Sequence, residues 1–269
     1  MTGLVSVTFR QSTPEAVIHL ARQAGLDGIE WGGDIHLPPG DRELATEIGR
    51  KTRAEGLLPL SYGSYYRLLQ NADPERAFLP ILTSAKALEA PNIRIWAGEF
   101  PPGQAATADY RQAAAELRLL CKMAGEEGIQ ISMEYHRGTL TQTADSTLCL
   151  LGEAACKNLF TYWQPNPDLE PEQNSEELKK VCPYLSNLHV FYWSRGDIRQ
   201  PLADGRRQWE EYSRIAGKDP AYLLEFVKGD SPSALMEDAK TLGRILGKRT
   251  ENQWEESGDE GDIFHRCRK

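Results

Sequence analysis

Eight short runs rich in β-branched and aromatic residues recur along the chain, and a helical pattern separates each run from the next. The runs are Leu4–Phe9, Gly28–Trp31, Leu57–Tyr62, Asn92–Trp96, Ile129–His136, Leu159–Gln164, Asn187–Trp193 and Tyr222–Val227. Strands that alternate with helices in this way indicate βαβ units and a parallel sheet. Eight such units are the number that closes a (β/α)8 barrel, and 269 residues suit one such barrel. The sequence therefore predicts an α/β fold with a single TIM barrel.

The ends of the predicted helices carry boundary signals. Thr13 and Ser231 each precede a proline, so each can cap the first turn of a helix. Glycines follow three helical runs and precede a strand, where a left-handed residue is favoured: Gly25, Gly56 and Gly128. From residue 248 onward the chain is charged and has no periodicity. We expect a barrel over residues 1–247 and a flexible C-terminal tail over residues 248–269.

The composition of the chain argues against several classes of function. The formal net charge is -8 and the pI is about 5.3, whereas a nucleic-acid-binding domain normally carries a basic face. The given sequence shows no basic-then-apolar leader pattern and no apolar run long enough to span a bilayer, so we expect a cytoplasmic protein with no membrane partner. Its five cysteines show no CxxC spacing, which argues against a cysteine-rich zinc site. We expect a small molecule as the partner. The sequence does not indicate the oligomeric state.

Polar residues at the ends of the last four predicted strands are the candidate site. Catalytic groups of a barrel lie at the C-terminal ends of its strands, and Glu134, Gln164, His189 and Glu225 fall there. A buried carboxylate needs a cation or a metal, and strands five to eight carry no basic residue on the same face. Two carboxylates, an imidazole and an amide oxygen suit one divalent ion such as Mn, Mg, Co or Zn.

These four residues, together with the segments GIEWGGDIHLPPGD, EYHRGTLTQT, YWQPNP and LLEFVKGDS, resemble the xylose isomerase-like superfamily, and in particular its sugar phosphate isomerase/epimerase branch. The resemblance covers residues 1–247. It implies that Glu134 and Glu225 both bind a divalent metal and exchange protons with the substrate, and that His189 is a further ligand. The family usually has an acid where this chain has Gln164. Gln164 can bind the metal through its oxygen or orient a neighbour by a hydrogen bond.

Six further residues are candidates for binding the substrate. Alternation along the second strand favours Glu30 pointing inward and Trp31 outward. His36 and His136 can reach the substrate or pack within loops, and Trp193 can form an aromatic wall for a sugar ring. Arg195 and Lys228 follow strand ends, where they can receive a phosphate or carboxylate or stay as solvated surface charges.

The site chemistry predicts a metal-dependent isomerase or epimerase that acts on a sugar or sugar phosphate. One glutamate removes a proton next to a carbonyl, an enediolate forms, and the other glutamate returns the proton. A dehydratase acting on a keto-polyol of the inosose type uses the same chemistry and stays open. A sugar-binding barrel without catalysis also stays open because of Gln164. An endonuclease is disfavoured, because multi-zinc sites need more histidines than the five in this chain.

Overall fold

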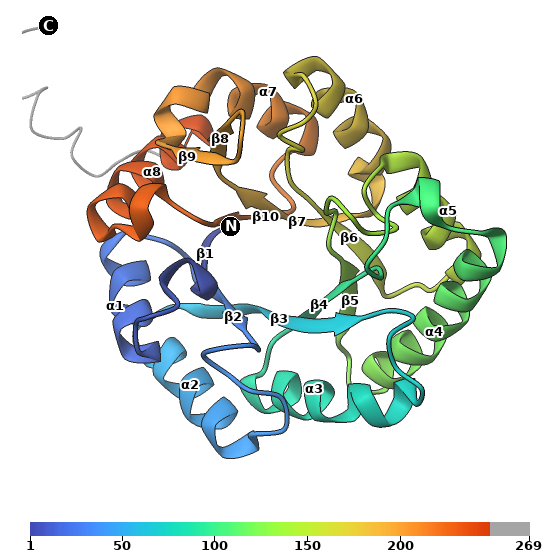
Figure 1. Cartoon of the computed structure of the whole chain (residues 1–269). Helices are drawn as coiled ribbons and strands as arrows, with labels where there is room; N and C mark the ends of the chain where they lie inside the picture. The colour runs from blue at the N-terminus through green and yellow to red at the C-terminus, as the bar shows by residue number, and fades with distance from the viewer. Residues whose placement is uncertain (248–269) are drawn as a thin grey trace, which may run out of the picture.

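The computed structural model describes residues 1–247, and eight parallel strands in it form a closed barrel (Figure 1). Around the barrel the strands follow the order β1-β10-β7-β6-β5-β4-β3-β2. Their bounds are β1 Thr2–Val5, β2 Gly28–Gly32, β3 Leu58–Arg67, β4 Asn92–Trp96, β5 Gln130–Met133, β6 Leu159–Trp163, β7 Leu185–Val190 and β10 Ala221–Leu224. The predicted TIM barrel is therefore confirmed. The tail predicted for residues 248–269 lies outside the described residues.

Within the described part of the chain, eight α-helices surround the strands (Figure 1). They are α1 Pro14–Gln23, α2 Arg42–Ala54, α3 Pro74–Leu88, α4 Thr107–Glu126, α5 Ala144–Ala154, α6 Pro171–Val181, α7 Arg206–Ala216 and α8 Pro232–Ile245. No helix within residues 1–247 is long and apolar enough to cross a membrane. The cytoplasmic location stays a prediction.

Several strands end earlier than the sequence predicts. The first strand ends at Val5, and a 3-10 helix occupies Ser6–Phe9. Strands β5 and β10 likewise stop just before Glu134 and Glu225. The backbone N–H of Glu134 still donates to Ile95 at 2.9 Å, and that of Glu225 to Val190 at 3.0 Å. Both glutamates are therefore fixed at the rim by their neighbouring strands.

The structure confirms one of the two predicted N-terminal caps and all three predicted glycines at helix C-termini. Thr13 accepts a hydrogen bond from the Ala16 N–H at 3.3 Å. Gly25, Gly56 and Gly128 have φ values of 66°, 76° and 72°, which is the left-handed region that glycine adopts without strain. The cap at Ser231 is different, since its hydroxyl makes no capping bond to the backbone and lies 2.7 Å from the Ser233 hydroxyl instead.

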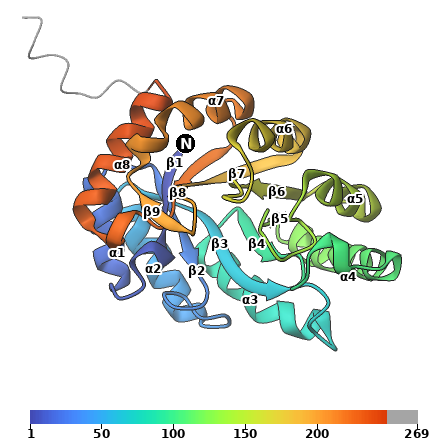
Figure 2. The same ribbon diagram turned by 45° about the horizontal axis from the view of Figure 1, so that its top comes forward.

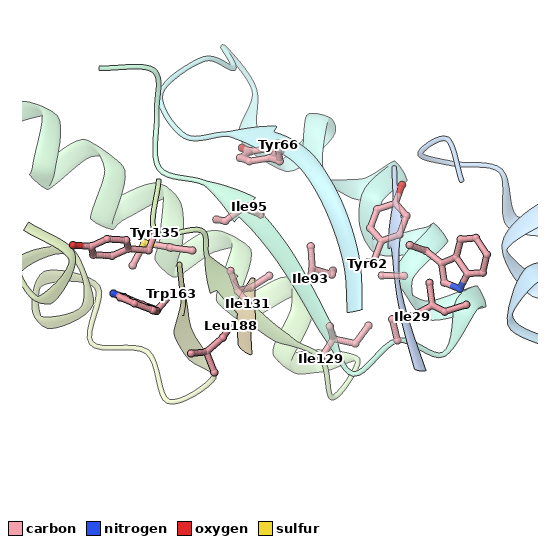
Figure 3. Packing of buried hydrophobic residues seen from close by; sticks show 14 of the residues in the cluster. Ile29, Tyr62, Tyr66, Ile93, Ile95, Ile129, Ile131, Tyr135, Trp163 and Leu188 are labelled. Carbon is pink, nitrogen blue, oxygen red and sulfur yellow. The ribbon is translucent and has the colours of Figure 1, made fainter. Parts of the chain in front are cut away.

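The hydrophobic core lies between the barrel and the helices. Side chains alternate along each strand, so Ile93 and Ile95 of β4 and Ile131 of β5 point outward into this layer (Figure 3). Trp31 and Trp163 lie in the same core and are fully buried. The intervening residues point into the barrel, which is where the polar side chains collect.

The barrel interior holds a hydrogen-bonded polar layer below the strand ends. Tyr162 is its centre: the phenol oxygen accepts from the Asn92 amide at 3.0 Å and from the Asn187 amide at 2.7 Å. The same hydroxyl donates to Glu30 at 2.7 Å. A fully bonded layer of this kind is rigid, because any displaced member leaves a buried polar group unpaired. It supports the groups above it.

An antiparallel hairpin that the sequence did not predict follows β7. Its strands are β8 Tyr192–Ser194 and β9 Ile198–Gln200, and it lies beside α8 (Figures 1 and 2). The turn uses Gly196 and Asp197, both with positive φ. Trp193 therefore belongs to the hairpin and not to the barrel strand that the sequence assigned to it.

Asp238 on α8 is expected to make stability depend on pH. Its carboxylate accepts the Leu202 N–H at 2.8 Å, and burial raises its pKa to about 6. Because the folded pKa exceeds the unfolded one, the favourable contribution is complete below about pH 4 and is lost as the pH rises through 6. We expect Asp238→Asn to stabilise the protein by about 2 kcal/mol more at pH 7 than at pH 4. Urea unfolding at both values tests this, and an equal effect at both would contradict it.

Candidate active site

Three oxygen atoms converge on one nitrogen of a buried histidine. Nδ1 of His189 on β7 lies 3.2 Å from Gln164 Oε1, 3.3 Å from Glu225 Oε2 and 3.7 Å from Glu134 Oε1. His189 is fully buried, and both glutamates are about 5% exposed. The structure thus brings together the four residues that the sequence proposed as metal ligands.

The other nitrogen of His189 faces Glu30 on β2. Nε2 lies 3.6 Å from Glu30 Oε1, which is beyond hydrogen-bond range, and within residues 1–247 it has no hydrogen-bond partner. The Tyr162 ring meets the imidazole edge-on at 5.1 Å between centroids. Glu30 and the Tyr162 ring lie against the imidazole, and its Nδ1 points at the three oxygens. Such an outer carboxylate is a common partner of metal-binding histidines.

Arg94 on β4 is the central residue that the sequence argument missed. Its Nε donates to Glu30 Oε1 at 2.9 Å, and its Nη1 donates to Glu134 Oε2. The side chain is 3% exposed. The prediction that Glu134 lacks a basic partner is therefore wrong, because its partner comes from β4 and not from strands five to eight. An isolated arginine in the apolar strand NIRIW was the available signal.

Gly63 on β3 leaves room for this ion pair. A Cβ atom at position 63 would lie 2.8 Å from Glu30 Oε1 and 2.9 Å from Arg94 Nη2. Real Cβ atoms essentially never approach other atoms so closely. A side chain there would have to displace a buried charged group, so glycine is required by the pair and not by the backbone angle.

The buried charges shift one another's pKa values. Burial raises the pKa of Glu225, His189 partly opposes this, and the result is about 7. Burial lowers the pKa of His189, but Glu225 and Glu30 outweigh it and raise it to about 9. Burial alone would raise the pKa of Glu30, yet Arg94 and His189 lower it to about 2. Both raised pKa values have the same cause, which is that a proton on His189 or Glu225 offsets the excess of buried carboxylates.

The donor set and the charge balance both fit a divalent cation. Glu30, Glu134, Glu225 and Arg94 leave two net negative charges when His189 is neutral, which one divalent ion balances. Two ligands of one such ion lie about 3.0–3.4 Å apart, close to the 3.2–3.7 Å found around Nδ1. As placed, no three His, Cys, Asp or Glu side chains in residues 1–247 are close enough to hold a metal.

A cavity of about 250 Å³ opens above these groups. Glu134, Gln164 and Glu225 line its floor together with Arg94. Seven aromatic residues line its walls: Tyr65, Trp96, Tyr135, His136, Phe191, Trp193 and Phe226. The other lining residues are Arg137, Gln142, Pro165, Asn166 and Pro167. Apolar walls over a few convergent polar groups are typical of a small-molecule site.

Of the other residues predicted to bind the substrate, some line the cavity and others do not. His136 stacks at 4.4 Å from Trp96 and, like Trp193, lines the cavity. His36 does not line it, because its two nitrogens contact the Ser6 hydroxyl and the Ser12 carbonyl. Arg195 and Lys228 do not line it either. Arg195 is 93% exposed and pairs with Glu170, while Lys228 donates to Gln200 at 3.3 Å.

Sequence comparison decides the family. A model of the xylose isomerase-like TIM barrel family matches residues 18–167, which is more than half of the chain. The chain belongs to this family. A curated relative in Bacillus anthracis, a 3-dehydroshikimate dehydratase, is 25% identical over 210 residues, covering 72% of each chain.

Solved structures share the fold of this xylose isomerase-like barrel. An L-ribulose 3-epimerase superposes with a TM-score of 0.74 at 15% identity, over 97% of this chain and 99% of the other. A xylose isomerase-like protein from Mycobacterium smegmatis, solved in complex with magnesium, has a TM-score of 0.65 at 18% identity, over 88% and 90% of the two chains. These similarities show the fold.

Proposed function

We propose that this protein is a metal-dependent isomerase or epimerase of a small sugar, acting by proton transfer next to a carbonyl. The observation that carries the proposal is the convergence of Glu134, Gln164 and Glu225 on Nδ1 of His189, at the floor of an aromatic-walled cavity. Glu134, Gln164, His189 and Glu225 would hold a divalent ion, and such an ion would supply Lewis acidity to polarise the substrate carbonyl. The magnesium complex of a structural relative and the sugar epimerase among them support this assignment.

The chain's own residues supply the proton transfers. Glu134 and Glu225 enter the cavity from different strands, on either side of His189 in the barrel order. One removes the proton from the carbon next to the carbonyl, and the other returns a proton to the opposite face. Arg94 holds Glu134 in place through its second oxygen. Aromatic walls limit the access of water to the enediolate formed in between.

Hydrogen exchange with solvent tests the proposal. The purified chain is stripped with chelator and reloaded separately with Mn, Mg, Co or Zn, and the bound metal is counted by elemental mass spectrometry. Ketoses are then incubated with each metal-loaded protein and with the stripped protein in D₂O. Deuterium at the carbon next to the carbonyl is followed by NMR. We expect about one ion per chain and metal-dependent deuterium uptake. Exchange that is equally fast in the stripped protein contradicts the assignment.

A dehydratase is the second candidate, because a curated relative is a 3-dehydroshikimate dehydratase. The same proton removal can be followed by loss of a β-hydroxyl instead of reprotonation. The two reactions differ in product mass, since only the dehydratase releases water. Mass spectrometry of the exchange mixtures distinguishes them. Metal-free sugar binding without exchange would instead indicate a binding protein.

A further inference from the structure

We propose that the substrate is an uncharged polyhydroxy carbonyl compound of one sugar ring, and neither a sugar phosphate nor a sugar acid. This inference rests on the proposed function and narrows it. The evidence lies in how the cations around the cavity are paired, in the loops where a phosphate would bind, and in the walls of the cavity.

Each cation that lines the cavity already faces two carboxylates. Among the lining residues these cations are Arg94 and Arg137. Arg94 contacts Glu30 and Glu134. Arg137 lies 3.2 Å from Asp168 and 2.9 Å from Asp197. A divalent ion balances the two negative charges of the floor, and Arg137 with its two aspartates carries one net negative charge. Neither arginine therefore offers an unpaired positive charge to a phosphate or carboxylate.

The loops where barrels often hold phosphate carry acidic residues here. Phosphate sites of TIM barrels are frequently built by the loops after the seventh and eighth strands. In this chain those loops contain Asp197, bound to Arg137, and Asp230, whose carboxylate is 2.5 Å from Arg199. A phosphate would have to displace these carboxylates from their arginines. The arginines of these loops, Arg195 and Arg199, pair with Glu170 and Asp230, and Lys228 donates to Gln200. None of these three cations lines the cavity.

The walls suit the apolar faces of a neutral ring. Trp193 lies 4.7 Å from Phe191 and 6.0 Å from Phe226 between ring centroids, and it faces the cavity. The C–H faces of a sugar pack well on aromatic rings, whereas an anion is repelled by their negative faces. The volume of about 250 Å³ is at the small end for ligand sites, which fits one ring.

Matched pairs of ligands test this inference on the full chain with Mg²⁺ added. The pairs are D-fructose and D-fructose 6-phosphate, L-ribulose and L-ribulose 5-phosphate, and a neutral keto-inositol and 3-dehydroshikimate, a cyclic keto acid. Binding is followed by intrinsic tryptophan fluorescence, because Trp96 and Trp193 line the cavity. We expect at least one uncharged member to bind about tenfold or more tightly than its charged partner.

A double variant tests the role of the aspartates. In D168N/D197N, Arg137 loses both carboxylates, so affinity for the sugar phosphates should rise about fivefold. E176Q/E237Q makes the same change in net charge on the exposed surfaces of α6 and α8, and should leave that affinity unchanged.

The outcomes separate this inference from the proposed function. Tighter binding of the charged members, or no binding of any uncharged member, overturns the inference. Binding of uncharged members without deuterium uptake contradicts the proposed function and leaves the inference standing. Deuterium uptake by a sugar phosphate alone supports the proposed function and overturns the inference.

Discussion

Replacing Glu225 or Glu134 by glutamine is expected to abolish deuterium exchange into the substrate. Glutamine keeps the shape of the side chain but cannot accept and return a proton, and each proton transfer contributes about 10²–10⁴-fold to such a rate. We expect a loss of at least about 1,000-fold in either variant. The measurement is the initial rate of deuterium uptake in the metal-loaded protein, followed by NMR.

Glu116→Gln is the matched control for this substitution. Glu116 is also buried, but it accepts hydrogen bonds from the Tyr66 hydroxyl at 2.6 Å and the Leu69 N–H at 2.9 Å and does not line the cavity. A glutamine oxygen can accept a bond there, so exchange should stay within about threefold of the wild type. Normal exchange in Glu134→Gln or Glu225→Gln would remove that glutamate from the mechanism.

Replacing Arg94 by methionine is expected to cost about 3–5 kcal/mol in free energy of unfolding, measured by urea denaturation of chelator-treated protein. The substitution leaves Glu30 and Glu134 buried without their guanidinium partner. Removing one partner of a buried ion pair is far more costly than losing the pair as a whole. The double variant R94M/E30Q should therefore recover at least about half of the lost stability.

Arg137→Met separates this effect from the loss of any arginine with two carboxylate partners. Arg137 also binds two aspartates, but its side chain is 34% exposed. Solvent screens exposed pairs, so we expect a cost below about 1 kcal/mol. If Arg94→Met cost no more than Arg137→Met, the guanidinium would not be what stabilises the buried carboxylates.

The periodicity of the sequence was enough to predict the barrel. Alternation of strand and helix patterns is local, and only one closed arrangement accommodates eight such units with right-handed crossovers. Strand alternation also correctly favoured Glu30 inside the barrel and Trp31 outside, whereas only the structure shows Gln164 at the cavity and Trp163 in the core. Strand ends were less certain, because the side-chain pattern continues past Val5 where the backbone turns into a 3-10 helix.

The convergence of Glu134, Gln164, His189 and Glu225 also followed from the sequence. Each residue sits at the C-terminal end of its own strand, and a closed parallel barrel brings these ends to one face. Their roles as metal ligands and proton carriers remain predictions. What the sequence supplied was their position along each strand, which the barrel converts into proximity.

Only the tertiary structure decided how the charges pair. Arg94 contacts Glu30 on β2 and Glu134 just after β5, and no local pattern specifies contacts over 64 and 40 residues. His36 likewise follows a strand end but turns to the backbone of Ser12. Hydrophobic periodicity is set by burial on one face, which each segment encodes by itself. Ion pairing depends on the distance between side chains from different segments, and that distance exists only once the barrel closes.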